Sequence, residues 1–171
     1  MAKRTFMTQG QTFSATAAGA TVPNSTFMGI QGSAATQIVD ILEVLISGMA
    51  TASTVASMEF APVSTVPTTI TALAAPHHDY GNNQYISALS AVVSTYTAAT
   101  NPPTSSTVVG ALALNLGLNL FGGIIRWNAA PTQQVTMIGA GANTGSFLLY
   151  NCSTGGGASG LANAHIIYET T

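Results

Sequence analysis

Leucine stands at every second position of ALALNLGLNL, residues 111–120. The positions between the leucines hold Ala, Asn and Gly, so one face of the segment is uniformly apolar. Successive side chains of a β-strand point to opposite faces, and this period of two predicts a strand with its leucines against a core. The alternation runs through Val108–Leu120, and Phe121-Gly122-Gly123 after it predicts a bend or bulge.

The rest of the second half predicts further short strands. They cover residues 124–127, 135–138, 147–150 and 165–168, and clusters of Gly, Pro, Asn or Thr separate them. Many short strands at such spacing are typical of a β-sandwich or jelly roll. We therefore expect an all-β fold of one of these two kinds.

The first half contains one strong apolar segment, IVDILEVLI at residues 38–46. Its length and apolarity fit either a strand or a short helix, and its β-branched content favours the strand. As a strand it would place Asp40 and Glu43 on opposite faces, whereas a catalytic carboxylate pair needs a common face. Weaker strand candidates lie at residues 25–30, 51–60 and 65–73, the last at a sheet edge or at the start of a strand because it contains Pro67.

One short helix is expected within this β pattern, over residues 84–97. Its apolar residues recur at intervals of three and four, the spacing of one helical face. Asn101-Pro102 ends it, since the residue before a proline is disfavoured in the helical region. The residues that carry this spacing are Ile86, Leu89, Val92, Val93 and Tyr96.

A length of 171 residues suits a single domain with a sizeable core, so we assign residues 1–171 to one sandwich domain. Residues 1–24 precede the first strong segment and are interpreted as an extended N-terminal arm. No stretch approaches the ~20 apolar residues that a membrane helix needs. We expect no membrane partner.

Charged residues make up only 5% of the chain, against about a quarter in an ordinary soluble domain. The formal net charge is -2, and Ser, Thr, Asn, Gln and Gly take the place of ions. Uncharged polar groups cost less to desolvate than ions, so this composition favours a subunit whose faces are covered by neighbours. With three Lys and Arg in all, the chain lacks the basic cluster that nucleic-acid binding requires.

His77-His78-Asp79 is the one local group with metal-ligand or acid–base character. Adjacent side chains of an extended segment point to opposite faces, so the two histidines would not share an ion. No spacing links the third histidine, His165, to them. We interpret the group as part of a structural loop and expect no metal site.

Two glycine-rich segments, residues 139–145 and 155–160, lack the lysine and the spacing of a phosphate loop and are interpreted as strand connections. Cys152 is the single cysteine, which excludes an internal disulfide, and we interpret it as a small buried residue. No serine lies in a Gly-x-Ser-x-Gly turn. We therefore expect no catalytic, cofactor-binding or metal-binding residue, and no enzyme.

Arg126 is the lone charged residue between Tyr80 and Tyr168. Burying an unpaired guanidinium is costly. Arg126 is therefore exposed, or it pairs with a carboxylate such as Glu169 or with one from a neighbouring subunit.

The segment FGGIIRWNAAP, residues 121–131, resembles a stretch in small structural proteins of tailed bacteriophages, and AHIIYE at residues 164–169 is similar to theirs as well. The resemblance implies a capsid-associated β-sandwich, such as a head decoration (cement) protein, typically a homotrimer. Its partner would be the major capsid protein, and its location the capsid surface of the virion after synthesis in the host cytoplasm. No functional residue is carried over, because such proteins act through extended surfaces.

Two other interpretations stay open. One is a carbohydrate- or receptor-binding β-sandwich of a tail fibre, which would stack sugars on aromatic faces. The other is a jelly-roll coat protein that builds the shell itself. The stacking candidates are Tyr80, Tyr85, Tyr96, Trp127, Tyr150 and Tyr168, although core packing explains most of them more simply.

Overall fold

The computed structural model describes residues 4–14, 28–32, 35–62, 69–72, 93–100, 114–139, 146–151 and 161–170. Over these ranges the chain forms eleven strands and no helix. All described strand pairs are antiparallel, which allows short connections between neighbours. The predicted all-β class is confirmed.

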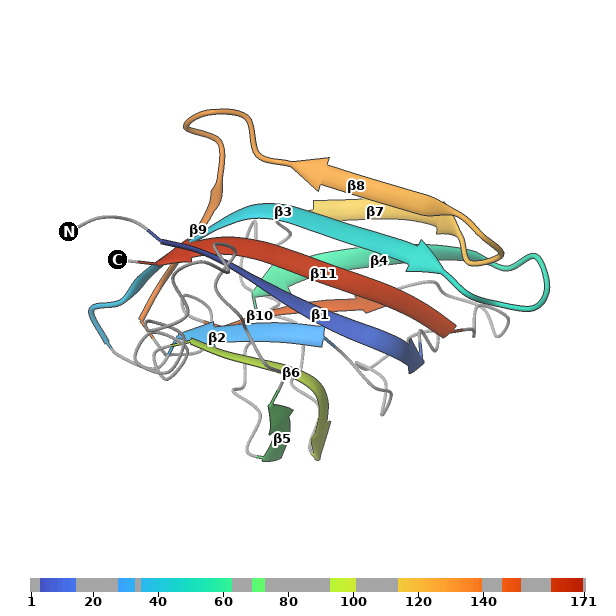
Figure 1. The fold of residues 1–171 in the computed structure, drawn as a ribbon, viewed down its shortest axis with the longest axis horizontal. Coiled ribbons are helices and arrows are strands. Elements are labelled where there is room, and N and C mark those ends of the chain that lie inside the picture. Colours follow the sequence, from blue (N-terminus) through green and yellow to red (C-terminus); the bar gives the residue numbers. More distant parts are fainter. Residues whose placement is uncertain are drawn as a thin grey trace, which may run out of the picture.

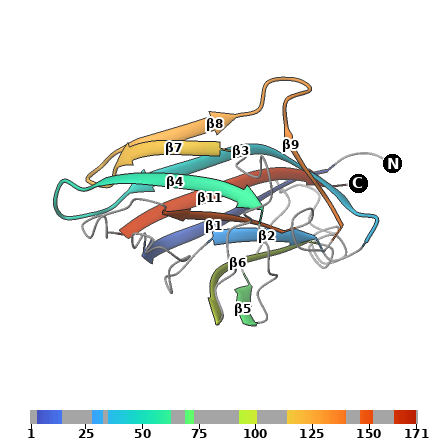
Figure 2. The ribbon, with the colours of Figure 1, turned by 180° about the vertical axis from the view of Figure 1, so that it is seen from behind.

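The strands form two sheets, seen as two layers from either side (Figures 1 and 2). Sheet A has the order β1-β11-β3-β8, and β9 also pairs with β3. Its strands are β1 (Arg4–Ser14), β3 (Ile38–Gly48), β8 (Ile124–Asn128), β9 (Val135–Ile138) and β11 (Leu161–Thr170). Sheet B has the order β5-β6-β2-β10-β4-β7. Its strands are β2 (Met28–Gly32), β4 (Val55–Pro62), β5 (Thr69–Ala72), β6 (Val93–Thr100), β7 (Leu114–Asn119) and β10 (Ser146–Asn151).

Strands that follow one another along the chain mostly alternate between the sheets. β1 to β4 alternate strictly, and so do β7, β8, β10 and β11, apart from β9, which follows β8 within sheet A. The first strand pairs with the last at one edge of sheet A, which is the arrangement of a jelly roll. β5 pairs with β6 at one edge of sheet B, so the edge position, one of the two predicted for residues 65–73, is confirmed for β5.

The core lies between the sheets and is built from their alternating inward residues. In β7, Leu116 and Leu118 are buried while Asn115, Gly117 and Asn119 are exposed, as the leucine alternation predicts. The rings of Phe60 and Phe147 are the aromatic contact of this core, with centroids 5.3 Å apart. The other core residues come mainly from β2, β3, β4, β10 and β11, and among the largest are Met28, Ile30, Ile41, Ile46, Met58, Leu149, Ile166 and Tyr168.

β3 is a strand, as its β-branched content predicts, but a bulge interrupts it. Ile41 and Glu43 pair with consecutive residues of β11, so Leu42 is an extra residue in the register. One extra residue exchanges the two faces of everything that follows it. The prediction that Asp40 and Glu43 lie on opposite faces is therefore wrong: both project from the outer face of sheet A. The residues that face the core change from odd to even positions across the bulge, and they are Val39, Ile41, Val44 and Ile46.

The predicted helix over residues 84–97 is wrong where the structure describes it. Residues 93–97 belong to β6, which pairs with β2 on one side and β5 on the other. Valine, threonine and tyrosine favour strands, and two pairing partners outweigh a helical spacing that rests on few residues. Residues 84–92 lie outside the described residues.

The predicted N-terminal arm is described in part. Residues 4–14 form β1, which pairs with β11 along its length at the edge of sheet A. Residues 15–24 lie outside the described residues. Within the described part of the chain no helix is long and apolar enough to span a membrane.

Candidate functional site

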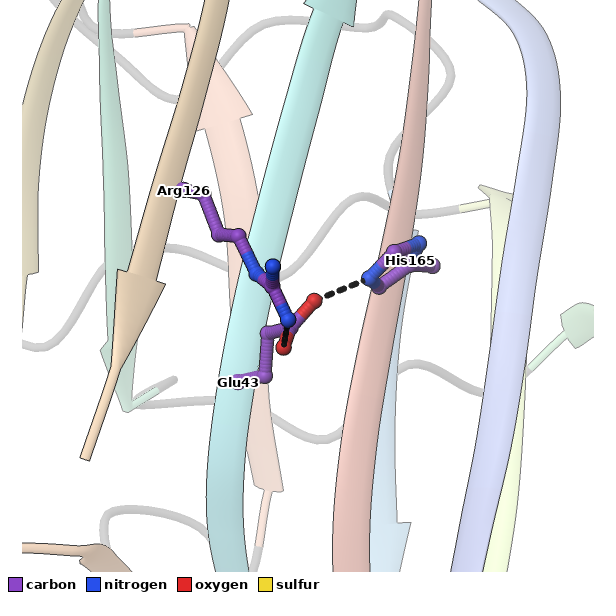
Figure 3. Close-up of polar contacts among 3 residues, drawn as sticks. All are labelled: Glu43, Arg126 and His165. Carbon is purple, nitrogen blue, oxygen red and sulfur yellow. Dashed lines mark hydrogen bonds and ion pairs between the residues drawn. The ribbon is translucent and has the colours of Figure 1, made fainter. Parts of the chain in front are cut away.

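Three ionisable side chains meet on the outer face of sheet A. Figure 3 shows Glu43 on β3 lying between Arg126 on β8 and His165 on β11. Arg126 and His165 both pair in register with Leu45, which is two residues after Glu43 and lies on the same outer face of β3. Each oxygen of the Glu43 carboxylate has its own partner: Arg126 Nη2 donates to Oε2 over 2.5 Å, and His165 Nε2 lies 2.5 Å from Oε1.

The environment of Glu43 favours its ionised form. Burial raises the pKa of the Glu43 carboxyl, but the hydrogen bonds and charges of Arg126 and His165 outweigh burial and hold it below its ordinary value. The hydrogen bond and the charge of Glu43 in turn raise the pKa of Arg126. The side chain of Glu43 is 7% exposed and that of Arg126 57%, so the pair is covered on one side and open to water on the other.

This arrangement ties three strands together and offers little for catalysis. A carboxylate whose two oxygens are both engaged is a poor general base, because a guanidinium and an imidazole stabilise its charge. Asp40, the other carboxylate of β3, accepts a separate hydrogen bond from Thr136 Oγ1 over 2.7 Å. Among the described residues, no group of three or more His, Cys, Asp or Glu side chains is placed to hold a metal ion.

The prediction that Arg126 pairs with a carboxylate is confirmed, but the suggested partner, Glu169, is wrong. Arg126 pairs with a carboxylate of its own chain, and that carboxylate is Glu43 in place of Glu169. His165 lies in a strand as expected, and it meets the same carboxylate. No sequence signal connected these residues, since Glu43 is 83 positions from Arg126 and 122 from His165.

A second feature lies at one end of the sandwich, where apolar side chains face solvent. Two connections meet there, residues 49–54 between β3 and β4 and residues 120–123 between β7 and β8. Backbone hydrogen bonds join them: Ala50 N–H donates to Leu120 O over 2.9 Å, and Leu120 N–H to Thr54 O over 2.7 Å. We call this end the apolar tip and define it by its exposed residues: Met49, Val55, Phe121 and Ile124.

The side chain of Asn119 holds both connections of the tip. Its Oδ1 accepts from the backbone N–H of Thr54 over 3.2 Å and of Phe121 over 2.9 Å, and its Nδ2 donates to Ser53 Oγ over 2.9 Å. The turn itself needs Gly122, whose φ of 72° suits glycine, so the predicted bend at Phe121-Gly122-Gly123 is confirmed. These hydrogen bonds fix the position of the two connections relative to each other.

The tip is apolar and free of charge. Val55 is 74% exposed, Ile124 71% and Phe121 59%. The sequence holds no charged residue at positions 44–58 or 114–125. Exposed apolar side chains that gather in one place mark a surface for a partner, whereas single ones need no explanation.

The other predicted site residues are only partly described. His77-His78-Asp79, residues 140–145 and 155–160, Cys152, Tyr80 and Tyr85 lie outside the described residues. Tyr96 lies in β6 and Tyr150 in β10. Tyr168 is buried, which raises the pKa of its hydroxyl, and Trp127 packs against the core. The buried ring of Tyr168 offers no stacking surface to a sugar, and that of Trp127 is partly buried.

Comparison of the chain with known protein families, with curated proteins and with solved structures finds no match.

Proposed function

We propose that this chain is a structural subunit of a virus particle, a decoration (cement) subunit on the head of a tailed bacteriophage. It docks through the apolar tip onto the major capsid protein and has no catalytic activity. The observation that carries the proposal is the tip itself, where two hydrogen-bonded connections and the strand starts that follow them expose four apolar residues: Met49, Val55, Phe121 and Ile124. The subunit is made in the host cytoplasm and resides on the capsid surface.

The energetics of such a contact follow from apolar burial. Burying one large apolar side chain contributes roughly 1.5–3 kcal/mol. A few tip residues can therefore supply most of the binding free energy of a specific interface. The Asn119 hydrogen bonds lower the cost of ordering the two connections on binding. Since neither segment of the tip carries a charge, binding responds little to salt.

The low charge of the whole chain supports the same proposal, because it leaves wide surfaces that neighbours can cover at small desolvation cost. The resemblance of residues 121–131 and 164–169 to phage structural proteins supports it from the sequence side. The resemblance implies a homotrimer, whereas the edge strand described below implies a dimer, and the mass of the chain in solution decides between them.

The test is binding of the purified chain to empty shells of the major capsid protein from the same virus. Phe121→Ser and Val55→Ser remove apolar surface from the tip and should each weaken binding about tenfold. Ile138→Ser is the matched control, because Ile138 is also exposed but pairs with Ile38 at the other end of β3. Affinity should change less than about twofold between low and moderate salt. Wild-type protein that fails to bind, or equal losses in all three variants, would reject the proposal.

A jelly-roll coat protein is the second candidate, and the strand order favours it. The same wrapping of two sheets recurs in viral capsid domains, although a fold by itself does not settle function. Electron microscopy of the purified chain separates the two candidates. Closed particles formed by this chain alone support a coat protein, and soluble small oligomers that bind preformed shells support decoration.

A further inference from the structure

The edge of sheet B formed by β7 has an unusual composition. β7 is the last strand of the sheet, and its one partner among the described strands is β4 (Figures 1 and 2). Its register with β4 runs without a bulge from Leu114 to Asn119. An edge strand presents free backbone N–H and C=O groups, and proteins normally protect it with charge, proline, a bulge or shortness.

β7 has none of these protections. Residues 114–119 contain no charged residue and no proline. The edge strands of sheet A differ, because β8 carries Arg126 and β1 begins with Arg4. β5 and β9, the remaining edge strands, are four residues long. The described edge best suited to receive another strand is therefore that of β7.

The sequence of this edge is the same in both directions. Residues 114–120 are Leu-Asn-Leu-Gly-Leu-Asn-Leu, with Gly117 at the centre. An antiparallel pair of two such strands, related by a two-fold axis at Gly117, places Asn115 opposite Asn119 and Leu116 opposite Leu118 of a second copy. Like side chains then meet on each face, with amides outside and leucines inside. Such a two-fold contact is the commonest kind in homo-oligomers.

Gly117 leaves room at the centre of this pair. A Cβ added there would meet nothing within 4 Å, and its φ lies in the range that other residues adopt. A glycine in a strand often marks the close approach of another backbone. Leu116 and Leu118 keep 9% and 8% of their surface exposed, and a strand added at the edge would cover more of it.

We propose that β7 pairs with β7 of a second copy of this chain, joining two six-stranded sheets into one across a two-fold axis at Gly117. Backbone hydrogen bonds give the contact its strength, and the uncharged palindrome gives its register. The dimer does not depend on the capsid proposal. If that proposal also holds, the two apolar tips lie at opposite ends of the paired strands, so one dimer can bridge two shell subunits.

The test is the mass of the purified chain in solution by size-exclusion chromatography with light scattering. Wild type should be a dimer at micromolar concentration. Gly117→Lys places two ammonium groups at the axis and should shift the mass from dimer to monomer at the same concentration. Ile138→Lys is the matched control, because it adds the same charge on an exposed residue of sheet A and should leave the dimer intact.

A mixing experiment separates a lost contact from a lost fold. Gly117→Lys and Gly117→Glu should each be monomeric, and their equimolar mixture should regain the dimer because opposite charges then meet at the axis. Wild type that is a monomer or a trimer, a Gly117→Lys variant that keeps the dimer mass, or a mixture that stays monomeric overturns the inference. Shell binding by monomeric Gly117→Lys is measured separately, so the two proposals can fail independently.

Discussion

Arg126 on β8 donates to Glu43 on β3 over 2.5 Å, across 83 residues of sequence. The contact ties an edge strand of sheet A to a central one, and His165 extends it to β11 on the other side of Glu43 (Figure 3). Three of the few ionisable groups of the chain therefore interact with one another within sheet A.

Replacing Glu43 should destabilise the fold modestly. Glu43→Ala removes both contacts and should lower the free energy of unfolding by about 1 kcal/mol, measured by urea denaturation. Arg126→Ala should have a smaller effect, because Arg126 is mostly exposed and Glu43 keeps His165. A larger loss in Arg126→Ala than in Glu43→Ala would contradict this ranking.

The same carboxylate predicts how stability depends on pH. The pKa of Glu43 is lower in the folded chain than its ordinary value of 4.5, because its two partners outweigh the effect of burial. The folded state therefore binds this proton less tightly than the unfolded state, and the stabilisation is complete above the ordinary value and lost as pH falls through the lowered one.

Glu43→Gln isolates this contribution. The stability difference between wild type and Glu43→Gln should be constant from neutral pH down to about 5 and should shrink toward about pH 3, as urea midpoints measured across that range would show. Parallel curves at every pH would exclude the assigned role of Glu43.

Gly48 should tolerate no side chain. A Cβ at this position would overlap the backbone of Leu120, which the tip hydrogen bonds hold in place. Gly48→Ala should therefore cost about 3 kcal/mol, seen as a lower thermal midpoint. Gly117→Ala is the matched control, since its Cβ enters open space, and it should stay within about 1 kcal/mol of wild type. Equal costs would mean that the close approach at Gly48 is absent in solution.

Two phenylalanines should behave in opposite ways. Phe60 is fully buried and contacts the ring of Phe147, so Phe60→Ala should cost about 3–5 kcal/mol of folding free energy. Phe121→Ala should change stability by less than about 0.5 kcal/mol, because the ring faces solvent at the tip. Chemical denaturation of both variants gives the comparison. A strong loss of stability in Phe121→Ala would mean that this ring packs within the fold and is not free at the surface.

The part of the fold that could be predicted rests on strong local patterns. The leucine alternation before Leu120 gave the correct faces of β7, and the β-branched content of residues 38–46 gave β3. Glycine, proline and asparagine clusters placed β8, β9 and β10 within one residue of their observed bounds, whereas the strand predicted at residues 165–168 extends over residues 161–170 as β11. These signals work because a strand with one buried face imposes a period of two on its own residues.

What could not be predicted depends on residues distant in sequence. The bulge at Leu42 leaves no local mark, yet it brings Asp40 and Glu43 onto one face. The partner of Arg126 follows from the order β11-β3-β8, which a single sequence does not encode in any short window. Tyr96 fitted a helical spacing as well as a strand, and pairing with β2 settled it.

The place of β11 has a consequence for synthesis. This strand lies between β1 and β3, so these two strands cannot be joined into one sheet until residues 161–170 have left the ribosome. β3 can pair with β8, and β4 with β7, before that point. The edges of β1 and β3 that face β11 stay unpaired in the meantime, and such edges are where a nascent chain is open to wrong strand pairing.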